Sequence, residues 1–237
     1  MILLLLGFFD SFLFPGSMLH EEQFNPAYLH QKKFEVMLGS EQRFELPELR
    51  TVGVYSQVGR YSIRAASFGH DLYRENLLGF GAGFPVTDYI ALGFGITGMN
   101  CLVRDLSNDF TYSIKAGGLL DAGDLSFSGW VNNVNVPRIS AVDCTPVSYA
   151  VRFDYRPRAN LGFNFSVRGI AAGLPFYNCG ILFAPHEIML LGLGVNTQPV
   201  LLEFGMKLSP GRVFFSYSGS RHQQLGMTHI FGVGFTQ

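Results

Sequence analysis

The sequence is poor in charged residues, tryptophan and cysteine. Only 15% of its 237 residues are charged, whereas an average soluble domain is about a quarter charged. One tryptophan and three cysteines stand beside 23 phenylalanines and 28 glycines, which is unusual for a cytosolic protein. The net charge of -1 supplies no basic surface, so no nucleic-acid partner is expected.

The three cysteines exclude two common kinds of site. Cys101, Cys144 and Cys179 are far apart and form no CxxC pair, which is not a zinc pattern. Three cysteines also cannot form a fully paired disulfide framework. One bridge between Cys101 and Cys144, which fall near expected loops, is an option in an oxidising compartment. Neither a metal nor a cofactor is expected.

Long apolar runs are also missing, with one exception at residues 1–14. This run is interrupted by Asp10 and is shorter than the roughly 20 residues that a spanning helix needs. It resembles the apolar region of a secretory signal, with Pro15, Gly16 and Ser17 near the place where cleavage would occur. We therefore expect residues 1–17 to be a signal peptide. A buried N-terminal helix or plug is the alternative, because the usual basic start is missing.

The rest of the chain lacks a sustained helical period and alternates instead. From Val147 to Tyr155 every second residue is apolar, and the same pattern recurs at 161–167, 200–208 and 228–235. Period two predicts strands with one apolar and one polar face. We expect about 14 strands, with about 12 as the alternative, of the 9–11 residues that suit a tilted membrane strand. Their expected starts lie near residues 33, 50, 60, 74, 88, 109, 124, 147, 160, 176, 187, 199, 211 and 226.

The connections between these strands favour a membrane barrel over a soluble sandwich. Tight segments with Pro or Gly, such as 57–60 and 209–212, alternate with longer ones, such as 40–49, 68–75, 103–109, 135–145 and 219–225. Outer-membrane barrels have short periplasmic turns and longer extracellular loops. A soluble sandwich has no reason to alternate in this way.

The predicted fold is all-β: a closed antiparallel up-and-down transmembrane β-barrel over residues 33–237. The expected location is the outer membrane of a Gram-negative cell, with both termini on the periplasmic side. Residues 18–32 precede the barrel as a short N-terminal segment. They could form a small plug, or a short helix limited by Pro26.

Charged residues inside the strands share one face. A charge facing lipid near the midplane costs roughly 2–4 kcal/mol for Arg or Lys, so these residues should face the lumen. There they could stabilise a filled lumen, mark a solute path or hold a plug. Glycines at 79–83 and 93–95 also face inward and leave room for a bulky neighbour or an inserted segment. The lumen-facing candidates are Arg64, Lys115, Arg152, Asp154, Arg168, Glu203 and Lys207.

A short motif precedes the first expected strand. Asn25, Pro26 and Ala27 lie within the segment Phe24–Leu29. This segment resembles the FadL/PorV-like superfamily of outer-membrane barrels, whose members have 14 strands and carry it near the mature N-terminus. The glycine- and aromatic-rich ending at 226–235 is similar to the last strand of that family. The chain is shorter than typical members, and the PorV/PorQ branch, linked to type IX secretion, is the closer likeness.

The resemblance implies a non-enzymatic barrel that acts as an accessory or partner of a transport or type IX-like secretion system. Its partners would be membrane lipid and proteins of a secretion apparatus. The alternative is a FadL-like pore or uptake channel for small or hydrophobic solutes. The six histidines are scattered along the sequence, so no Ser–His–acid site is indicated and no catalytic, cofactor-binding or metal-binding residue is predicted.

Overall fold

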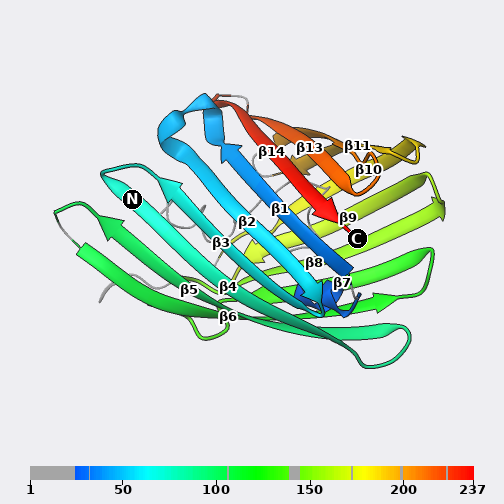
Figure 1. Cartoon of the computed structure of the whole chain (residues 1–237), viewed down its shortest axis with the longest axis horizontal. Coiled ribbons are helices and arrows are strands. Elements are labelled where there is room, and N and C mark those ends of the chain that lie inside the picture. Colours follow the sequence, from blue (N-terminus) through cyan, green and yellow to red (C-terminus); the bar gives the residue numbers. More distant parts are fainter. Residues whose placement is uncertain are drawn as a thin grey trace.

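A computed structural model describes residues 25–31, 33–105, 107–138, 145–171, 173–197, 200–222 and 224–237. These residues form a closed antiparallel barrel of 14 strands in which each strand pairs with its neighbours in sequence (Figure 1). The ring closes where β1 pairs with β14, from Glu35 opposite Thr236 to Gln42 opposite His229. The predicted fold class is therefore confirmed.

The strands begin within two residues of their expected starts, because proline, glycine and charged residues interrupt the alternation where the chain turns. Three short 3-10 helices complete the described elements: η2 (Pro26–His30), η3 (Arg43–Glu45) and η4 (Pro47–Leu49). Among the described residues, none of the helices has the length and apolar character needed to cross a membrane. The strands are β1 (Lys33–Gln42), β2 (Arg50–Gly59), β3 (Tyr61–Gly69), β4 (Tyr73–Pro85), β5 (Ile90–Val103), β6 (Ser107–Asp121), β7 (Leu125–Asn132), β8 (Ser148–Arg158), β9 (Leu161–Ile170), β10 (Phe176–His186), β11 (Met189–Thr197), β12 (Val200–Leu208), β13 (Val213–His222) and β14 (Gly226–Thr236).

The expected alternation of short and longer connections is only partly correct. At the end opposite the C-terminus, segments 43–49 and 133–147 are long. The connections expected to be long after β3, β5 and β13 are in fact short, covering only 70–72, 104–106 and 223–225. There the strands continue through polar residues, since backbone pairing does not depend on side-chain polarity. The orientation with periplasmic termini stays a prediction.

The outer wall of the barrel is apolar. Outward positions carry large exposed side chains, among them Phe94, Ile96, Phe127 and Phe153. Every strand has a hydrogen-bonded partner on both sides, so the wall has no open sheet edge. A strand-built wall that is closed and apolar on the outside satisfies the conditions for contact with lipid.

This wall gives a first testable prediction. Ile96 is 49% exposed near the middle of β5, so arginine there would meet hydrocarbon. We expect Ile96→Arg to destabilise the barrel by about 2–4 kcal/mol when it is refolded in lipid vesicles, measured by urea unfolding. Tyr89→Arg, in the turn just before β5, is the matched control and should cost at most about 1 kcal/mol. Equal effects at the two sites would contradict the assignment of the lipid-facing wall.

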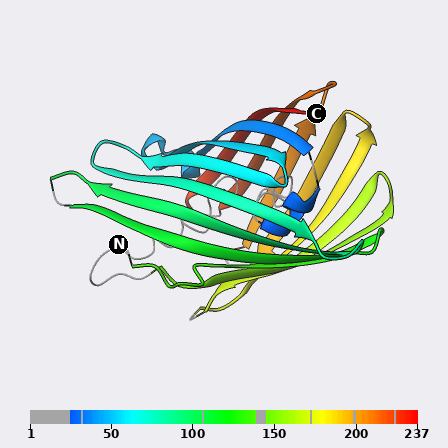
Figure 2. The same cartoon turned by 60° about the horizontal axis from the view of Figure 1, so that its bottom comes forward.

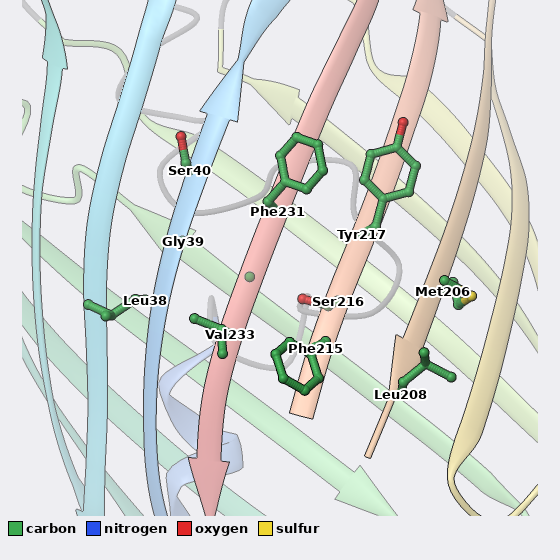
Figure 3. Close-up of a pocket in the computed structure, with 11 residues that line it drawn as sticks. Leu38, Gly39, Ser40, Met206, Leu208, Phe215, Ser216, Tyr217, Phe231 and Val233 are labelled. Carbon is green, nitrogen blue, oxygen red and sulfur yellow. The ribbon is translucent and has the colours of Figure 1, made fainter. Parts of the chain in front are cut away.

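A shallow apolar groove of about 500 Å³ follows the outside of the closing seam (Figure 3). Gly39 on β1 lies opposite Gly232 on β14, and both line the groove where it crosses the seam. At one edge, the Tyr217 hydroxyl lies 2.9 Å from His229 Nδ1. The groove opens on the lipid-facing side of the wall, so the hydrocarbon of the bilayer is sufficient to fill it. Its apolar lining includes Leu38, Met206, Leu208, Phe215, Phe231 and Val233.

Candidate functional site in the barrel lumen

The N-terminal helix η2 lies inside the ring of strands, packed against β4, β5 and β6 (Figure 2). Asn25, Pro26 and Ala27 are all buried there. The helix occupies the end of the barrel at which β1 begins and β14 ends. The segment with the family motif is thus placed as a plug would be. Residues 1–24, and with them the expected signal peptide, lie outside the described residues.

Asn25 both caps η2 and fastens it to the wall. Its side-chain Oδ1 accepts a hydrogen bond from the Ala27 amide at 3.0 Å, which is a helix N-cap. Its Nδ2 donates to the carbonyl oxygens of Gly118 on β6, at 2.9 Å, and Gly129 on β7, at 3.2 Å. Pro26 follows at the first helical position, where its missing N–H is not needed. The side chain of Asn25 therefore forms hydrogen bonds with both the start of η2 and the barrel wall.

Further contacts hold the other parts of η2. Ala27 is fully buried in a cluster with Ala91 and Leu119, and Tyr28 packs against that cluster. At the end of η2, Gln57 on β2 donates from Nε2 to the carbonyl oxygen of Gln31 at 2.8 Å. Apart from the chain that leads on into β1, η2 is thus held on both sides of the lumen by non-covalent contacts.

The wall facing η2 is kept free of side chains by glycine. A Cβ on Gly93 would lie 2.1 Å from the carbonyl carbon of Pro26, and one on Gly117 would lie 2.1 Å from Asn25 Oδ1. At Gly83 it would lie 2.6 Å from the His30 amide nitrogen. Real Cβ atoms do not approach other atoms so closely, so glycine is required for η2 to dock. The inward glycines leave room for an inserted segment, as the sequence predicts, and η2 takes it.

Arg152 and Asp154 form the tightest ion pair that the described lumen contains. Both project inward from β8, and Arg152 Nε lies 2.8 Å from each carboxylate oxygen of Asp154. Arg152 Nη2 lies 2.5 Å from Asp154 Oδ1. Both side chains are largely buried. The alternation of β8 predicts this pair, because residues two apart on a strand share a face.

Glu203 belongs to a separate polar group on β10, β11 and β12. Its Oε2 accepts from Asn178 Nδ2 at 3.3 Å, and its Oε1 accepts from Asn196. Arg168 on β9 acts electrostatically on the same carboxylate. Among these lumen-facing candidates the structure therefore pairs Arg152 with Asp154, and it places Arg168 close enough to Glu203 to act on its carboxylate.

The other three candidates also lie on the inner face. Lys115 is 5.0 Å from the centre of the Trp130 ring, and Lys207 is 4.3 Å from that of Phe214, both within the range of a cation–π contact. Arg64 Nη2 donates to Thr97 Oγ1 at 2.9 Å. These interactions leave the seven candidates in several local groups along the inner wall. Which of them contact a solute stays a prediction.

The sequence interpretation missed three inward acids: Glu35, Glu41 and Glu75. All three are buried. Glu35 pairs with Lys33 at 3.1 Å, and Glu41 accepts a hydrogen bond from Arg43 Nε at 2.9 Å. The available signal was parity, because both acids of β1 share a face with Met37. This inner face of β1 is hard to recognise from the sequence, because methionine and glycine alternate there with the two acids.

The lumen is not uniformly polar. Beside the closing seam the inner faces of β1 to β4, β13 and β14 supply a buried apolar cluster. Phe214 lies across the inner side of Gly234, where a Cβ would be 2.3 Å from its ring. One sector of the lumen is therefore packed like a protein core. The cluster consists of Met37, Tyr55, Ala66, Leu77, Phe214 and Ile230.

The described residues show no grouping of three or more His, Cys, Asp or Glu side chains that could hold a metal ion. Cys101 and Cys179 are free thiols, one buried and one exposed. Cys144 lies outside the described residues, and the free thiol of Cys101 does not support the bridge between Cys101 and Cys144 that was an option from the sequence.

No protein-family model matches the sequence, and no curated protein matches it either. Several solved structures match in fold. The outer membrane protein Omp33 of Acinetobacter baumannii has a TM-score of 0.58 at 11% identity, covering 88% of this chain and 99% of that one. The toluene transporter TodX of Pseudomonas putida has a TM-score of 0.58 at 8% identity, covering 96% and 94%. A FadL homologue of Pseudomonas aeruginosa has a TM-score of 0.53 at 9% identity, covering 90% and 92%.

At these identities the likeness concerns the fold. That fold, together with the apolar outer wall, is that of an outer-membrane β-barrel, and its architecture is similar to those of TodX and the FadL homologue. The three proteins named are an outer membrane protein, a transporter and a FadL homologue.

Proposed function

We propose that the chain is a non-enzymatic uptake channel for small hydrophobic solutes, closed at the end of the barrel occupied by η2. The observation that carries this proposal is the way η2 docks. Apart from its chain connection to β1, this segment is attached by hydrogen bonds and packing against a wall that Gly83, Gly93 and Gly117 keep free of side chains, so it can leave without breaking the barrel. A plug that served only to fill the lumen could instead be packed against ordinary side chains.

The lining of the lumen supports a hydrophobic solute. Small-molecule sites are mostly apolar, with a few placed polar groups. Here an apolar cluster around Met37 and Phe214 adjoins charged groups, since Lys207 lies 4.3 Å from the Phe214 ring and Arg64 lies opposite Tyr55 of the cluster in register. The structural likeness to the toluene transporter TodX favours the same class of solute.

The accessory role in secretion is the second expectation from the sequence. It is supported by the resemblance of Asn25, Pro26 and Ala27 to the PorV/PorQ branch. The solved structures named above support the channel instead, since they include a transporter and a FadL homologue. We therefore place uptake first and retain secretion as an outcome that the test distinguishes.

The test measures uptake of radiolabelled toluene by Gram-negative cells that produce the barrel. We expect the initial rate to exceed that of cells with an empty vector by several-fold, and the gain to disappear when η2 is tied to the wall. A Tyr28→Cys/Ser128→Cys pair bridged by a short bis-thiosulfonate reagent would provide such a tie, because the Tyr28 hydroxyl lies 3.3 Å from Ser128 Oγ and the reagent replaces the length of the tyrosine ring. Reducing the two disulfides of this bridge should restore uptake.

As a control, heat-modifiable migration on gels must show that each variant is present in the outer membrane as a folded barrel. An unchanged uptake rate with folded protein present would refute the channel. Reproducible co-purification of outer-membrane secretion components from detergent extracts, together with that result, would favour the accessory role.

A further inference from the structure

The outer face of the barrel changes from apolar to polar near the end at which β1 finishes. On β1 the outward side chains run from Leu38 through Ser40 to Gln42. On β2 the outward Val52 is followed toward the same end by Arg50. A membrane wall has to be apolar only across the hydrocarbon, so this change marks the level of the lipid headgroups.

Three polar side chains lie side by side at this level, and we call them the seam row: Arg50 on β2, Gln42 on β1 and His229 on β14. Strand register places Gln42 directly opposite both of the others. Neighbouring strands are about 4.8 Å apart, so the row is roughly 10 Å wide. The seam row borders the shallow groove, because the next outward residues of β1 and β14, Ser40 and Phe231, line it (Figure 3).

Arg50 is the cation that this end of the groove offers to a ligand. Its side chain is exposed, and its Nε donates to Ser40 Oγ at 3.2 Å, which ties the guanidinium to the edge of the groove. In the described part of the chain no carboxylate pairs with it. His229 already faces the carboxylate of Glu45, with 3.7 Å between Nε2 and Oε1. The phosphate of a lipid is therefore attracted to Arg50, whose two Nη groups can donate to it in parallel.

A second outward arginine lies two strands from the first. Arg74 on β4 is opposite Gly69, the last residue of β3, and β3 pairs on its other side with β2, which begins at Arg50. The glycine leaves the outer surface between the two arginines without a side chain. Arg74 has only a long contact with Asp71, 3.6 Å, and Asp71 is 87% exposed. Such an exposed pair is weak, so Arg74 can also bind a phosphate.

Uncharged donors continue this polar level across the next strands. Asn76 is the outward residue beside Arg74, and its Nδ2 donates to Asn100 Oδ1 on β5 at 3.4 Å. Asn100 Nδ2 in turn donates to Asn108 Oδ1 on β6 at 2.5 Å. Amide side chains can donate to and accept from hydroxyl groups, so this surface suits a sugar headgroup.

We propose that the groove and the polar level above it bind lipid A, the phosphorylated disaccharide lipid of the Gram-negative outer leaflet. One acyl chain lies in the groove against Leu38 and Val233, and the two phosphates lie at Arg50 and Arg74. The predicted orientation, with periplasmic termini, places this end in the outer leaflet. A glycerophospholipid with one phosphate would leave the second arginine unused. The site is on the outer face, so this inference does not depend on the proposed channel.

The test counts lipids bound to the whole barrel, refolded in detergent, by native mass spectrometry with diphosphoryl lipid A. We expect one lipid A per barrel, bound about tenfold or more tightly than phosphatidylglycerol. Arg50→Gln should weaken lipid A binding about tenfold, because it removes charge-assisted hydrogen bonds to phosphate. Arg212→Gln removes the same charge from the exposed turn between β12 and β13, at the opposite rim, and should leave binding unchanged.

A second pair of variants tests the groove. Val233→Trp places a large ring where the acyl chain would lie and should weaken lipid A binding several-fold. Val195→Trp is the matched control, because both valines are 41% exposed but Val195, on β11, is not part of the groove lining. It should bind lipid A like the wild type.

Equal affinity for lipid A and phosphatidylglycerol would overturn this inference, as would unchanged binding in both Arg50→Gln and Val233→Trp. Heat-modifiable migration must show that each variant is folded, and if one fails to fold the other decides. A preference for phosphatidylglycerol that is lost in Arg50→Gln would also refute lipid A, and would assign the groove to a phospholipid instead. Toluene uptake by the same variants stays a separate result, since neither outcome requires the other.

Discussion

Alanine at Gly117 is expected to drive η2 out of the lumen. The new Cβ would lie 2.1 Å from Asn25 Oδ1 and 3.0 Å from Pro26 Cδ. Asn25 cannot turn aside freely, because its amide group is bonded to Ala27 and to two strand carbonyls. Overpacking of this kind costs about 1–3 kcal/mol. The undocked population should then rise by roughly 5- to 150-fold.

Two measurements check this result. Hydrogen exchange of the backbone amides in residues 25–31 should accelerate, and the initial rate of toluene uptake should increase. Gly118→Ala is the matched control on the same strand, since the nearest atom to its Cβ would be Leu92 Cδ2 at an ordinary 3.8 Å. It also keeps the carbonyl that Asn25 needs. If both variants exchange at the wild-type rate, η2 is not held by the glycine wall.

The strands could be predicted from the sequence because their pattern is local. Alternation is a property of consecutive residues, so a segment such as Val147–Tyr155 identifies both its strand and its inner face without knowledge of its neighbours. The same parity locates Arg152 and Asp154 on one side. The ion pair between them could be predicted because it needs only one strand.

Contacts between strands require information that alternation does not carry. Asn25 donates to the carbonyls of Gly118 and Gly129, which are 93 and 104 residues away in the sequence, so these hydrogen bonds depend on closure of the barrel. Lys207 lies over Phe214, and Glu203 meets Asn178, because of register between strands. Parity can say that a side chain faces the lumen, but a shift of register changes its neighbour.

The connections after β3, β5 and β13 are shorter than predicted for a related reason. Near β3 and β13 the apolar alternation fades before the strand ends, because residues such as His222 lie beyond the part of the wall that needs an apolar face. Backbone pairing continues there, since each strand satisfies the N–H and C=O groups of its neighbour. Side-chain patterns therefore show the lipid-facing part of a strand more directly than its full length.

Asp154→Ala is expected to be the most destabilising single substitution among the lumenal charges considered. It removes the carboxylate that accepts three close contacts from Arg152, whose side chain is only 12% exposed. Breaking a buried pair from one side costs about 3–5 kcal/mol, because a charge is left behind. The loss in the free energy of unfolding is measured by urea unfolding in lipid vesicles, with heat-modifiable migration on gels as the readout of the folded fraction.

Two comparison variants separate the lost pair from a general effect of removing an acid. Asp124→Ala, in the exposed turn before β7, should change stability by no more than about 0.5 kcal/mol. The double variant Arg152→Leu/Asp154→Leu should recover part of the loss, since it leaves no charge stranded. If Asp154→Ala costs less than about 1 kcal/mol, the pair behaves like a surface salt bridge. The lumen around β8 would then be open to water, and the passage would be wider at that point than the buried side chains indicate.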